Sequence, residues 1–203
     1  DAVATGSGNN ATASLTVSGQ SLFISAGTGN TVGVPDSASY SVDYVVLVTD
    51  VAGNAVNNAT VTVQIRPREY LKGQFAFSST SNRWVFAPPI FTCPNEDTNR
   101  NGVLDAGEDI NDSKRLEPGI PINVTTSKTT NVNGVATVTM TYPRDRAYWT
   151  TVDMTITARV VGTEATYVTY TSLTGLTTDY NKSDTSPPGQ ISPYGRADCD
   201  SKD

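Results

Sequence analysis

The 203-residue chain contains no histidine. This absence excludes catalytic triads in which histidine is the general base, and it excludes metal sites with imidazole ligands. The chain also has no run of roughly 18 apolar residues, the length that a membrane-spanning helix needs, so we expect no membrane insertion. Its 14 Lys and Arg residues are outnumbered by 20 Asp and Glu residues and are scattered singly. Nucleic acid, which is bound by clustered basic residues, is therefore not an expected partner.

Cysteine is scarce as well. The two cysteines, Cys93 and Cys199, are far apart in the chain and form no C-x-x-C pair, which disfavours a redox or zinc site. One structural disulfide between them is the simpler interpretation, and it requires an oxidising compartment. Only 17% of the residues are charged, and Thr and Val are the most frequent types. This composition is typical of an exported β protein.

Several short segments alternate between apolar and other residues with a period of two, which predicts strands with one buried face. The clearest lie at 42–48, 61–65, 136–142 and 154–160. Turn sequences rich in Asp, Asn and Gly separate them, at 50–54 and 133–134. No segment shows a helical period over three turns. We therefore predict an all-β fold, specifically an immunoglobulin-like β-sandwich with a long loop insertion.

Such a sandwich needs only about 100 residues, so the chain has a surplus. Residues 1–14 consist mainly of Gly, Ser, Asn, Ala and Thr and are predicted to form a flexible linker. Residues 15–203 are predicted to form a single domain. The surplus lies in an insertion at about 66–119 and in an extended tail at about 177–203. An insertion of this length needs a function or a stabilising device of its own.

Residues 97–108 match every fixed position of the calcium-loop pattern D-x-[DN]-x-[DN]-G-x5-E. In such loops a glycine permits the sharp turn, and oxygen atoms at defined positions surround the ion. The ligand positions are occupied here by Asp97, Asn99, Asn101, Val103 (through its carbonyl), Asp105 and Glu108. We predict one calcium ion in this loop. The alternative is a solvated loop in which side chains cap the backbone and no metal binds.

An EF-hand would place a helix before this loop, but residues 87–94 contain three prolines and cannot be helical. A structural ion is therefore expected, not a calcium switch that opens a pair of helices. The following residues repeat the phase of the first loop and offer a possible second calcium site, with Lys114 in place of the turn glycine. Its ligand positions fall on Asp109, Asn111, Ser113, Arg115 and Glu117.

Residues 45–63 and 130–138 resemble the core strands of bacterial Ig-like group 1 domains, the invasin and intimin type. Residues 70–73, 93–97, 116–119, 186–189 and 192–195 resemble a subgroup found in large exported proteins of Gram-negative bacteria. The resemblance implies an extracellular spacer without catalytic activity that presents adhesive surfaces at the bacterial cell. It implies neighbouring Ig-like modules, or a surface protein or glycan receptor, as partners. The calcium loops are a departure, because typical members lack them.

The sequence leaves three other functions to consider. Glycoside hydrolysis by a carboxylate pair is disfavoured, because the acidic cluster occupies calcium-ligand positions. A carbohydrate- or protein-binding module would use exposed aromatic side chains, although burial in a core is the simpler interpretation for these residues. They are Tyr70, Phe75, Phe77, Trp84, Phe86, Tyr148 and Trp149. A subunit or terminal module of a surface filament would dock a neighbour through an acidic face or an edge strand.

Overall fold

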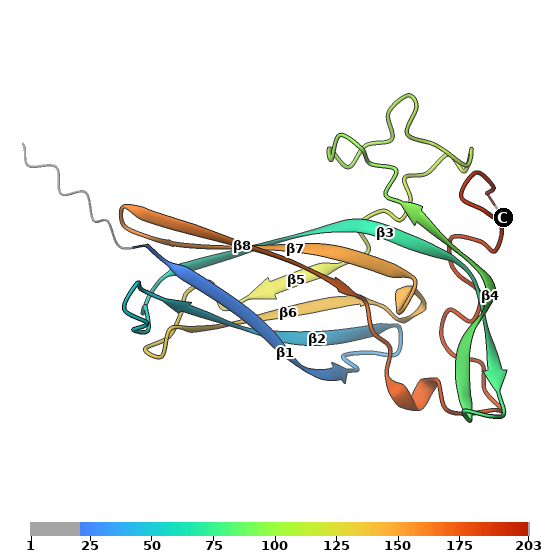
Figure 1. Cartoon of the computed structure of the whole chain (residues 1–203), viewed down its shortest axis with the longest axis horizontal. Coiled ribbons are helices and arrows are strands. Elements are labelled where there is room, and N and C mark those ends of the chain that lie inside the picture. Colours follow the sequence, from blue (N-terminus) through green and yellow to red (C-terminus); the bar gives the residue numbers. More distant parts are fainter. Residues whose placement is uncertain (1–20, 203) are drawn as a thin grey trace, which may run out of the picture.

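The computed structural model describes residues 21–202, and the predicted linker at 1–14 lies outside them. Two four-stranded antiparallel sheets pack face to face, which confirms the predicted all-β sandwich (Figure 1). The first sheet has the order β1 (Phe23–Gly33), β2 (Ser39–Thr49), β6 (Val135–Pro143), β5 (Asn123–Thr126). The second has the order β4 (Arg83–Pro94), β3 (Thr60–Ser78), β7 (Thr150–Val160), β8 (Thr163–Ser172).

Within the described residues, helix is limited to two single 3-10 turns, η1 (Arg144–Arg146) and η2 (Thr177–Asp179). Across residues 21–202, no helix has the length and apolar character needed to cross a membrane.

The main core lies between the sheets, where the period-two segments place their apolar side chains. In β6, Ala136, Val138, Met140 and Tyr142 are all buried, and the threonines between them face outward. The segments predicted at 42–48, 61–65 and 154–160 lie within β2, β3 and β7 and contribute the other buried rows. Alternation along each strand is therefore what turns one face of each sheet into core.

Strand β3 is longer than a sandwich strand needs to be, and its buried face changes along its length. Its first part pairs with β7 and buries Ile65 and Pro67 toward the main core. A register shift between Pro67 and Glu69 inserts one residue, so that Tyr70 and Lys72 become the buried side chains. A bulge of this kind moves every later side chain to the opposite face. The outer part of β3 consequently faces a second core.

A second register shift, between Lys72 and Gln74, lies at Gly73. Its φ is 143°, and a Cβ atom there would lie 2.5 Å from Cδ1 of Ile90. Only glycine fits at this close approach between β3 and β4. Beyond it, Phe75 is buried in place of the even-numbered residues.

The second core is largely aromatic and lies under the β3–β4 extension. Its buried members are Tyr70, Phe75, Cys93, Trp149, Tyr180 and Tyr194. The C-terminal tail completes it, since the indole N–H of Trp149 donates to the Gly189 carbonyl at 2.7 Å and that of Trp84 to the Lys182 carbonyl at 2.7 Å. The region predicted as an insertion, 66–119, thus contains the outer part of β3 and all of β4. Irregular chain begins only after Pro94.

Candidate metal centre

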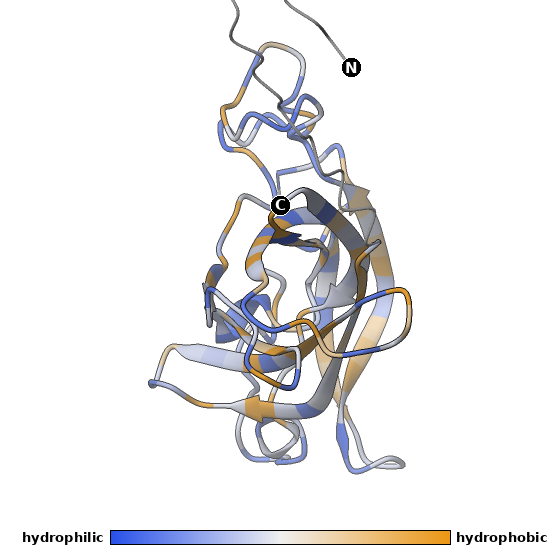
Figure 2. Cartoon of the chain, turned by 90° about the vertical axis from the view of Figure 1, so that its left-hand side faces the viewer, coloured by the Kyte–Doolittle hydropathy of each residue, from blue (hydrophilic) through white to orange (hydrophobic). Residues whose placement is uncertain are grey.

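After β4 the chain leaves the sheet, projects from one side of the molecule (top right in Figure 1) and returns as β5. Both predicted calcium loops lie in this projection. Figure 2, which colours the ribbon by hydropathy, shows mainly hydrophilic colours in the projecting loops, with isolated hydrophobic residues. The backbone of these loops must therefore be held by side-chain hydrogen bonds, because little apolar surface is available to order it.

The side chain of Asp97 holds the sharp turn of the first loop. Its Oδ1 accepts the N–H of Asn101 at 2.9 Å and its Oδ2 accepts the N–H of Gly102 at 2.9 Å. Gly102 has a φ of 75°, as the sharp turn requires. Oδ1 of Asn99 also lies 3.0 Å from the Asn101 nitrogen. The carboxylate of Asp97 and the amide of Asn99 therefore meet at one point of the loop.

Asp105 joins the same group from the other end of the loop. Its Oδ2 accepts one hydrogen bond from the amide nitrogen of Asn99 and one from that of Asn101, each at 2.7 Å. The Val103 side chain is 58% exposed, and this residue was predicted to bind only through its carbonyl. The structure thus gathers four of the six predicted ligands by their side chains. Carboxylate and amide oxygens are the hard donors that calcium prefers, so this set fits the ion.

Glu108 is placed differently from the other predicted ligands. Its Oε1 accepts the N–H and hydroxyl of Thr98, both at 2.9 Å, and its Oε2 accepts the N–H of Asp105 at 3.1 Å. These donors, first the Asp105 N–H, hold the pKa of Glu108 below its ordinary value. The buried carboxylate of Glu108 therefore ties the start of the loop to its end.

The second loop repeats the hydrogen bonds of the first. Oδ1 of Asp109 accepts the N–H of Ser113 at 2.8 Å, and its Oδ2 accepts the N–H of Lys114 at 3.0 Å. The amide nitrogen of Asn111 donates to Oε2 of Glu117 at 2.8 Å, as Asn99 does to Asp105. The hydroxyl of Ser113 donates to the carbonyl of Arg115 at 3.1 Å.

The backbone repeats as well. Positive φ angles occur at the same three loop positions, namely Arg100 and Asp112, Gly102 and Lys114, and Gly107 and Gly119. Five of these six values lie between 56° and 75°, and the sixth, at Gly107, is 92°. The two segments are therefore two copies of one structural unit, joined without a spacer.

Lys114 is where the copies differ. It stands at the glycine position with a φ of 64°, a conformation that a residue with a Cβ rarely adopts. Its ammonium group pairs with Asp112 and lies 3.8 Å from Oδ2 of Asp109. Lys202, from the tail, lies 3.7 Å from Asp112. A lysine ammonium group thus stands beside the first ligand position of the second loop.

Glu96 is a structural residue of this site that the pattern did not assign. It is fully buried, with Oε1 accepting the N–H of Ile110 at 3.2 Å and Oε2 accepting the N–H of Glu117 at 2.8 Å. Burial is the main cause that raises its pKa. The sequence did contain a signal: Glu96 precedes Asp97 as Glu108 precedes Asp109.

The loops rest on the second core and on the tail. Tyr70 lies beside Glu96 and Glu117, and burial raises the pKa of its phenol. The predicted disulfide Cys93–Cys199 is confirmed and links the end of β4 to the tail. Next to it, the buried ammonium group of Lys72 donates to the Asp198 carbonyl at 2.9 Å and also to the Ser201 carbonyl. The base of the site is therefore held by a covalent and a polar link.

Three of the predicted aromatic residues belong to the second core. Tyr70, Phe75 and Trp149 are buried core residues, so they cannot form an exposed aromatic platform.

Among residues 21–202, no group of three or more Asp, Glu or Cys side chains is preassembled as a metal site. The candidate ligand set accordingly mixes carboxylates with amides and main-chain oxygens.

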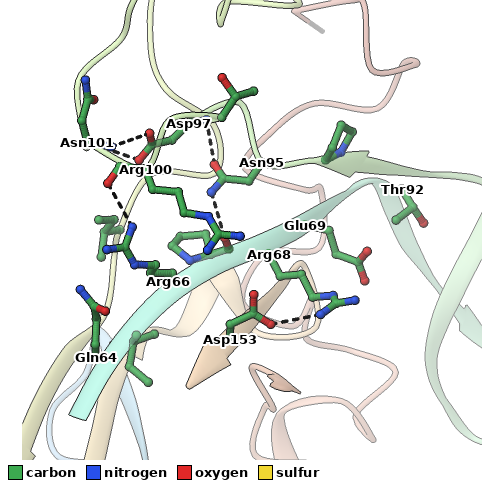
Figure 3. Close-up of a pocket in the computed structure, with 16 residues that line it drawn as sticks. Gln64, Arg66, Arg68, Glu69, Thr92, Asn95, Asp97, Arg100, Asn101 and Asp153 are labelled. Carbon is green, nitrogen blue, oxygen red and sulfur yellow. Dashed lines mark hydrogen bonds and ion pairs between the residues drawn. The ribbon is translucent and has the colours of Figure 1, made fainter. Parts of the chain in front are cut away.

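A groove of about 800 Å³ separates the first loop from β3 (Figure 3). Hydrogen bonds connect its two walls: the amide nitrogen of Asn95 donates to the Pro67 carbonyl at 2.8 Å, and the Arg66 guanidinium donates to the Arg100 carbonyl at 3.0 Å. Figure 3 shows Arg100 reaching from the loop over β3, the strand that carries Arg66 and Arg68. The position of the first loop therefore determines the shape of this groove.

No protein-family model matches the chain, and no curated protein matches it. The function must accordingly be argued from the loops, the groove and the fold that carries them.

Proposed function

We propose that this protein is a non-enzymatic, calcium-stabilised structural module of an extracellular adhesion protein at the bacterial cell surface. One observation carries the proposal: four oxygen-bearing side chains of the first loop gather at one point, and the next segment repeats the same unit. They are Asp97, Asn99, Asn101 and Asp105. A mixed set of carboxylates and amides at this spacing suits calcium.

Calcium would stabilise these loops by replacing hydrogen bonds that they now make within themselves. The amide nitrogens of Asn99 and Asn101 are directed at Asp105. Each amide also carries an oxygen, and a half-turn of its terminal torsion would present that oxygen instead. The ion would then neutralise Asp97 and Asp105, whose negative charges lie within one short loop.

The proposed ion suits the extracellular space. Extracellular calcium modules bind with Kd values of about 10⁻⁴–10⁻³ M. At a concentration ten times Kd, binding stabilises the folded state by only about 1.4 kcal/mol per site. This is enough to order a loop that is already supported by a disulfide. The disulfide also supports an oxidising location, because such bonds are rare in the cytosol.

A structural role agrees with how the acidic residues are used. The carboxylates of Glu96, Asp97, Glu108 and Asp109 all accept main-chain N–H groups of the loops. They are therefore occupied in ordering the backbone, which supports a non-enzymatic role. The expected partners are neighbouring Ig-like modules, or a surface protein or glycan receptor. A filament subunit would share this structural role.

The test is calorimetric melting of the chain, under non-reducing conditions, in excess calcium and in chelator. We expect calcium to raise the melting temperature by several degrees and to protect residues 95–122 from proteolysis. The variant Asp97→Ala/Glu108→Ala should lose both effects and keep a folded sandwich. The matched control Asp43→Ala/Glu164→Ala, which removes two acidic side chains outside the loops, should retain both. Equal melting with calcium and with chelator would overturn the proposal and leave a loop capped by its own side chains.

A further inference from the structure

We propose that the groove between β3 and the first loop binds a carboxylated sugar through Arg66 and Arg100. This inference names a ligand class for the proposed adhesion module, and only the calcium dependence of binding rests on the proposed calcium site. Carboxylated sugars here include sialic acids and uronic acids, which share one carboxylate and several hydroxyl groups.

Two guanidinium groups in the groove are available to an incoming anion. Among residues 21–202, Arg66 and Arg100 form no ion pair, and the Arg100 guanidinium has no hydrogen-bond acceptor. Arg66 uses one N–H to hold the Arg100 carbonyl. A guanidinium group carries five N–H donors in a planar fork that matches a carboxylate. Most of these donors are therefore unused.

Arg68 is already engaged and serves as a boundary of the site. It lies 3.2 Å from Asp153 and 5.1 Å from the ring centroid of Tyr170, which it covers. It is thus fixed in place, in contrast to Arg66 and Arg100. The carboxylate of the sugar is accordingly assigned to the end of the groove nearer the first loop, where Arg66 and Arg100 lie.

The remaining lining favours a sugar over a simple anion. Side-chain acceptors and hydroxyl or amide groups line the same groove, among them Gln64, Glu69, Thr92, Asn95 and Thr98. Sugar hydroxyls both donate and accept hydrogen bonds and can use all of these groups, whereas an ionised phosphate or sulfate can use only the donors. The volume of about 800 Å³ is large enough for a di- or trisaccharide, since small-molecule sites range over about 300–1,000 Å³.

The charge balance disfavours polyanions. The chain carries a net charge of −6, and the groove lining contains three arginines and three carboxylates. A polyphosphate, a sulfated chain or a strongly acidic peptide would meet Glu69 and Asp153 together with the arginines. A ligand with a single carboxylate avoids that repulsion. Calcium bound beside Asp97 would make the groove more positive, so it should strengthen the binding of an anion.

The experiment uses the intact chain and four defined sugars. Binding of 3′-sialyllactose and of a hyaluronan disaccharide, each with one carboxylate, is measured by calorimetry, with neutral lactose as the control. We expect at least one acidic sugar to bind, and lactose and the methyl ester of 3′-sialyllactose to bind at least tenfold more weakly. The ester tests the carboxylate without altering the protein, so this comparison does not depend on how variants fold. The two acidic sugars distinguish a sialic acid from a uronic acid.

Matched variants locate the site. Arg66→Gln and Arg100→Gln should each weaken binding about tenfold or more, the usual effect of removing a charge-assisted hydrogen bond. Arg83→Gln makes the same charge change in an exposed residue at the start of β4, outside the groove lining, and should leave binding unchanged. Unchanged melting temperatures will show that the variants are folded.

The assignment would be overturned by no binding of either acidic sugar, by equal binding of lactose, or by binding that Arg66→Gln and Arg100→Gln leave intact. Binding of an acidic peptide in place of the sugars would also overturn it. Repeating the titrations in chelator separates the two proposals. If sugar binding needs Arg66 and Arg100 but calcium neither binds nor strengthens it, the groove assignment stands and the calcium proposal fails.

Discussion

Glu96 and Glu108 perform the same task in two successive loops, twelve residues apart in the sequence. Glu108 accepts the N–H groups of Thr98 and Asp105. Glu96 accepts those of Ile110 and Glu117, which are the same positions of the second loop. Each carboxylate therefore closes one copy of the repeated unit. The second copy is closed by a residue that precedes the first copy, so the two loops are joined into one folded body.

Replacing either glutamate should loosen only the loop that it closes. A glutamine in place of Glu96 keeps one acceptor oxygen, and its NH₂ group faces an N–H donor, so one hydrogen bond is lost. We expect Glu96→Gln to accelerate amide hydrogen exchange at Ile110 and Glu117 by roughly tenfold or more. Glu108→Gln should have the same effect at Thr98 and Asp105.

Hydrogen exchange followed by NMR, residue by residue, checks this prediction. Glu69→Gln is the matched control, because Glu69 forms no ion pair within residues 21–202. Equal acceleration in both loops with either variant would contradict independent closure of the two copies.

The two glutamates should titrate in opposite directions from the ordinary value. Burial raises the pKa of Glu96, and N–H donors lower that of Glu108. In calcium-free protein, carboxyl NMR titration should therefore show Glu96 taking up its proton at higher pH than Glu108. Coincident titration of the two groups would contradict the difference in environment that the structure shows.

Because the pKa values of Glu96 and Glu108 are shifted in the folded protein, the free energy of unfolding depends on pH. The stabilisation from Glu108 is complete above the ordinary glutamate pKa of about 4.3 and is lost as the pH falls through the lowered folded value. Glu96 behaves oppositely, because its ionised form is disfavoured by burial. Its cost to folding is present above its raised folded pKa and is relieved as the pH falls through that value toward about 4.3. Denaturant unfolding of Glu108→Gln and parent, between neutral pH and pH 3, should show a stability gap that narrows below about pH 4.3.

Lys114 should determine whether the second loop binds calcium. Its substitution by glycine removes the ammonium group beside Asp109 and relieves a residue with positive φ. We expect Lys114→Gly to raise the calcium stoichiometry from one to two in titration calorimetry. Lys128→Gly is the matched control, because it replaces another lysine of positive φ, outside the loops. A stoichiometry that stays at one would show that another difference between the loops, such as Ile120 at the position of Glu108, prevents binding.

The disulfide should contribute a substantial part of the stability, because it closes a loop of 106 residues between β4 and the tail. Cys93→Ser with Cys199→Ser is expected to lower the free energy of unfolding by about 2–5 kcal/mol. Denaturant unfolding of both forms measures the difference. Each single Cys→Ser variant should match the double variant, since either one abolishes the bond. A difference below about 0.5 kcal/mol, the usual effect of a surface substitution, would mean that Lys72 and the aromatic core hold the tail unaided.

The strands and the repeated loop pattern could be predicted from the sequence alone, because both depend on residues close together in the chain. Alternation at 136–142 predicts a buried face in any sheet that accepts the strand. The spacing of Asp97, Asn99, Asn101 and Asp105 likewise brings four side chains together within one loop. The cysteine count was also sufficient to predict the disulfide, since only one pair was possible.

The second core, the role of Glu96 and the groove could not be predicted, because they depend on where distant segments of the chain meet. The register shifts of β3 turn Tyr70 and Lys72 toward a second core that exists only when the C-terminal tail packs there. The role of Glu96 depends on the second loop folding back onto it. The N–H groups that it accepts belong to Ile110 and Glu117, which lie 14 and 21 residues further along the chain. The arginine-lined groove forms where the first loop lies over β3, which brings Arg66 and Arg100 together across 34 residues of sequence. No local pattern can predict such pairs, because the free energy that places them comes from burial and hydrogen bonds between segments far apart in the chain.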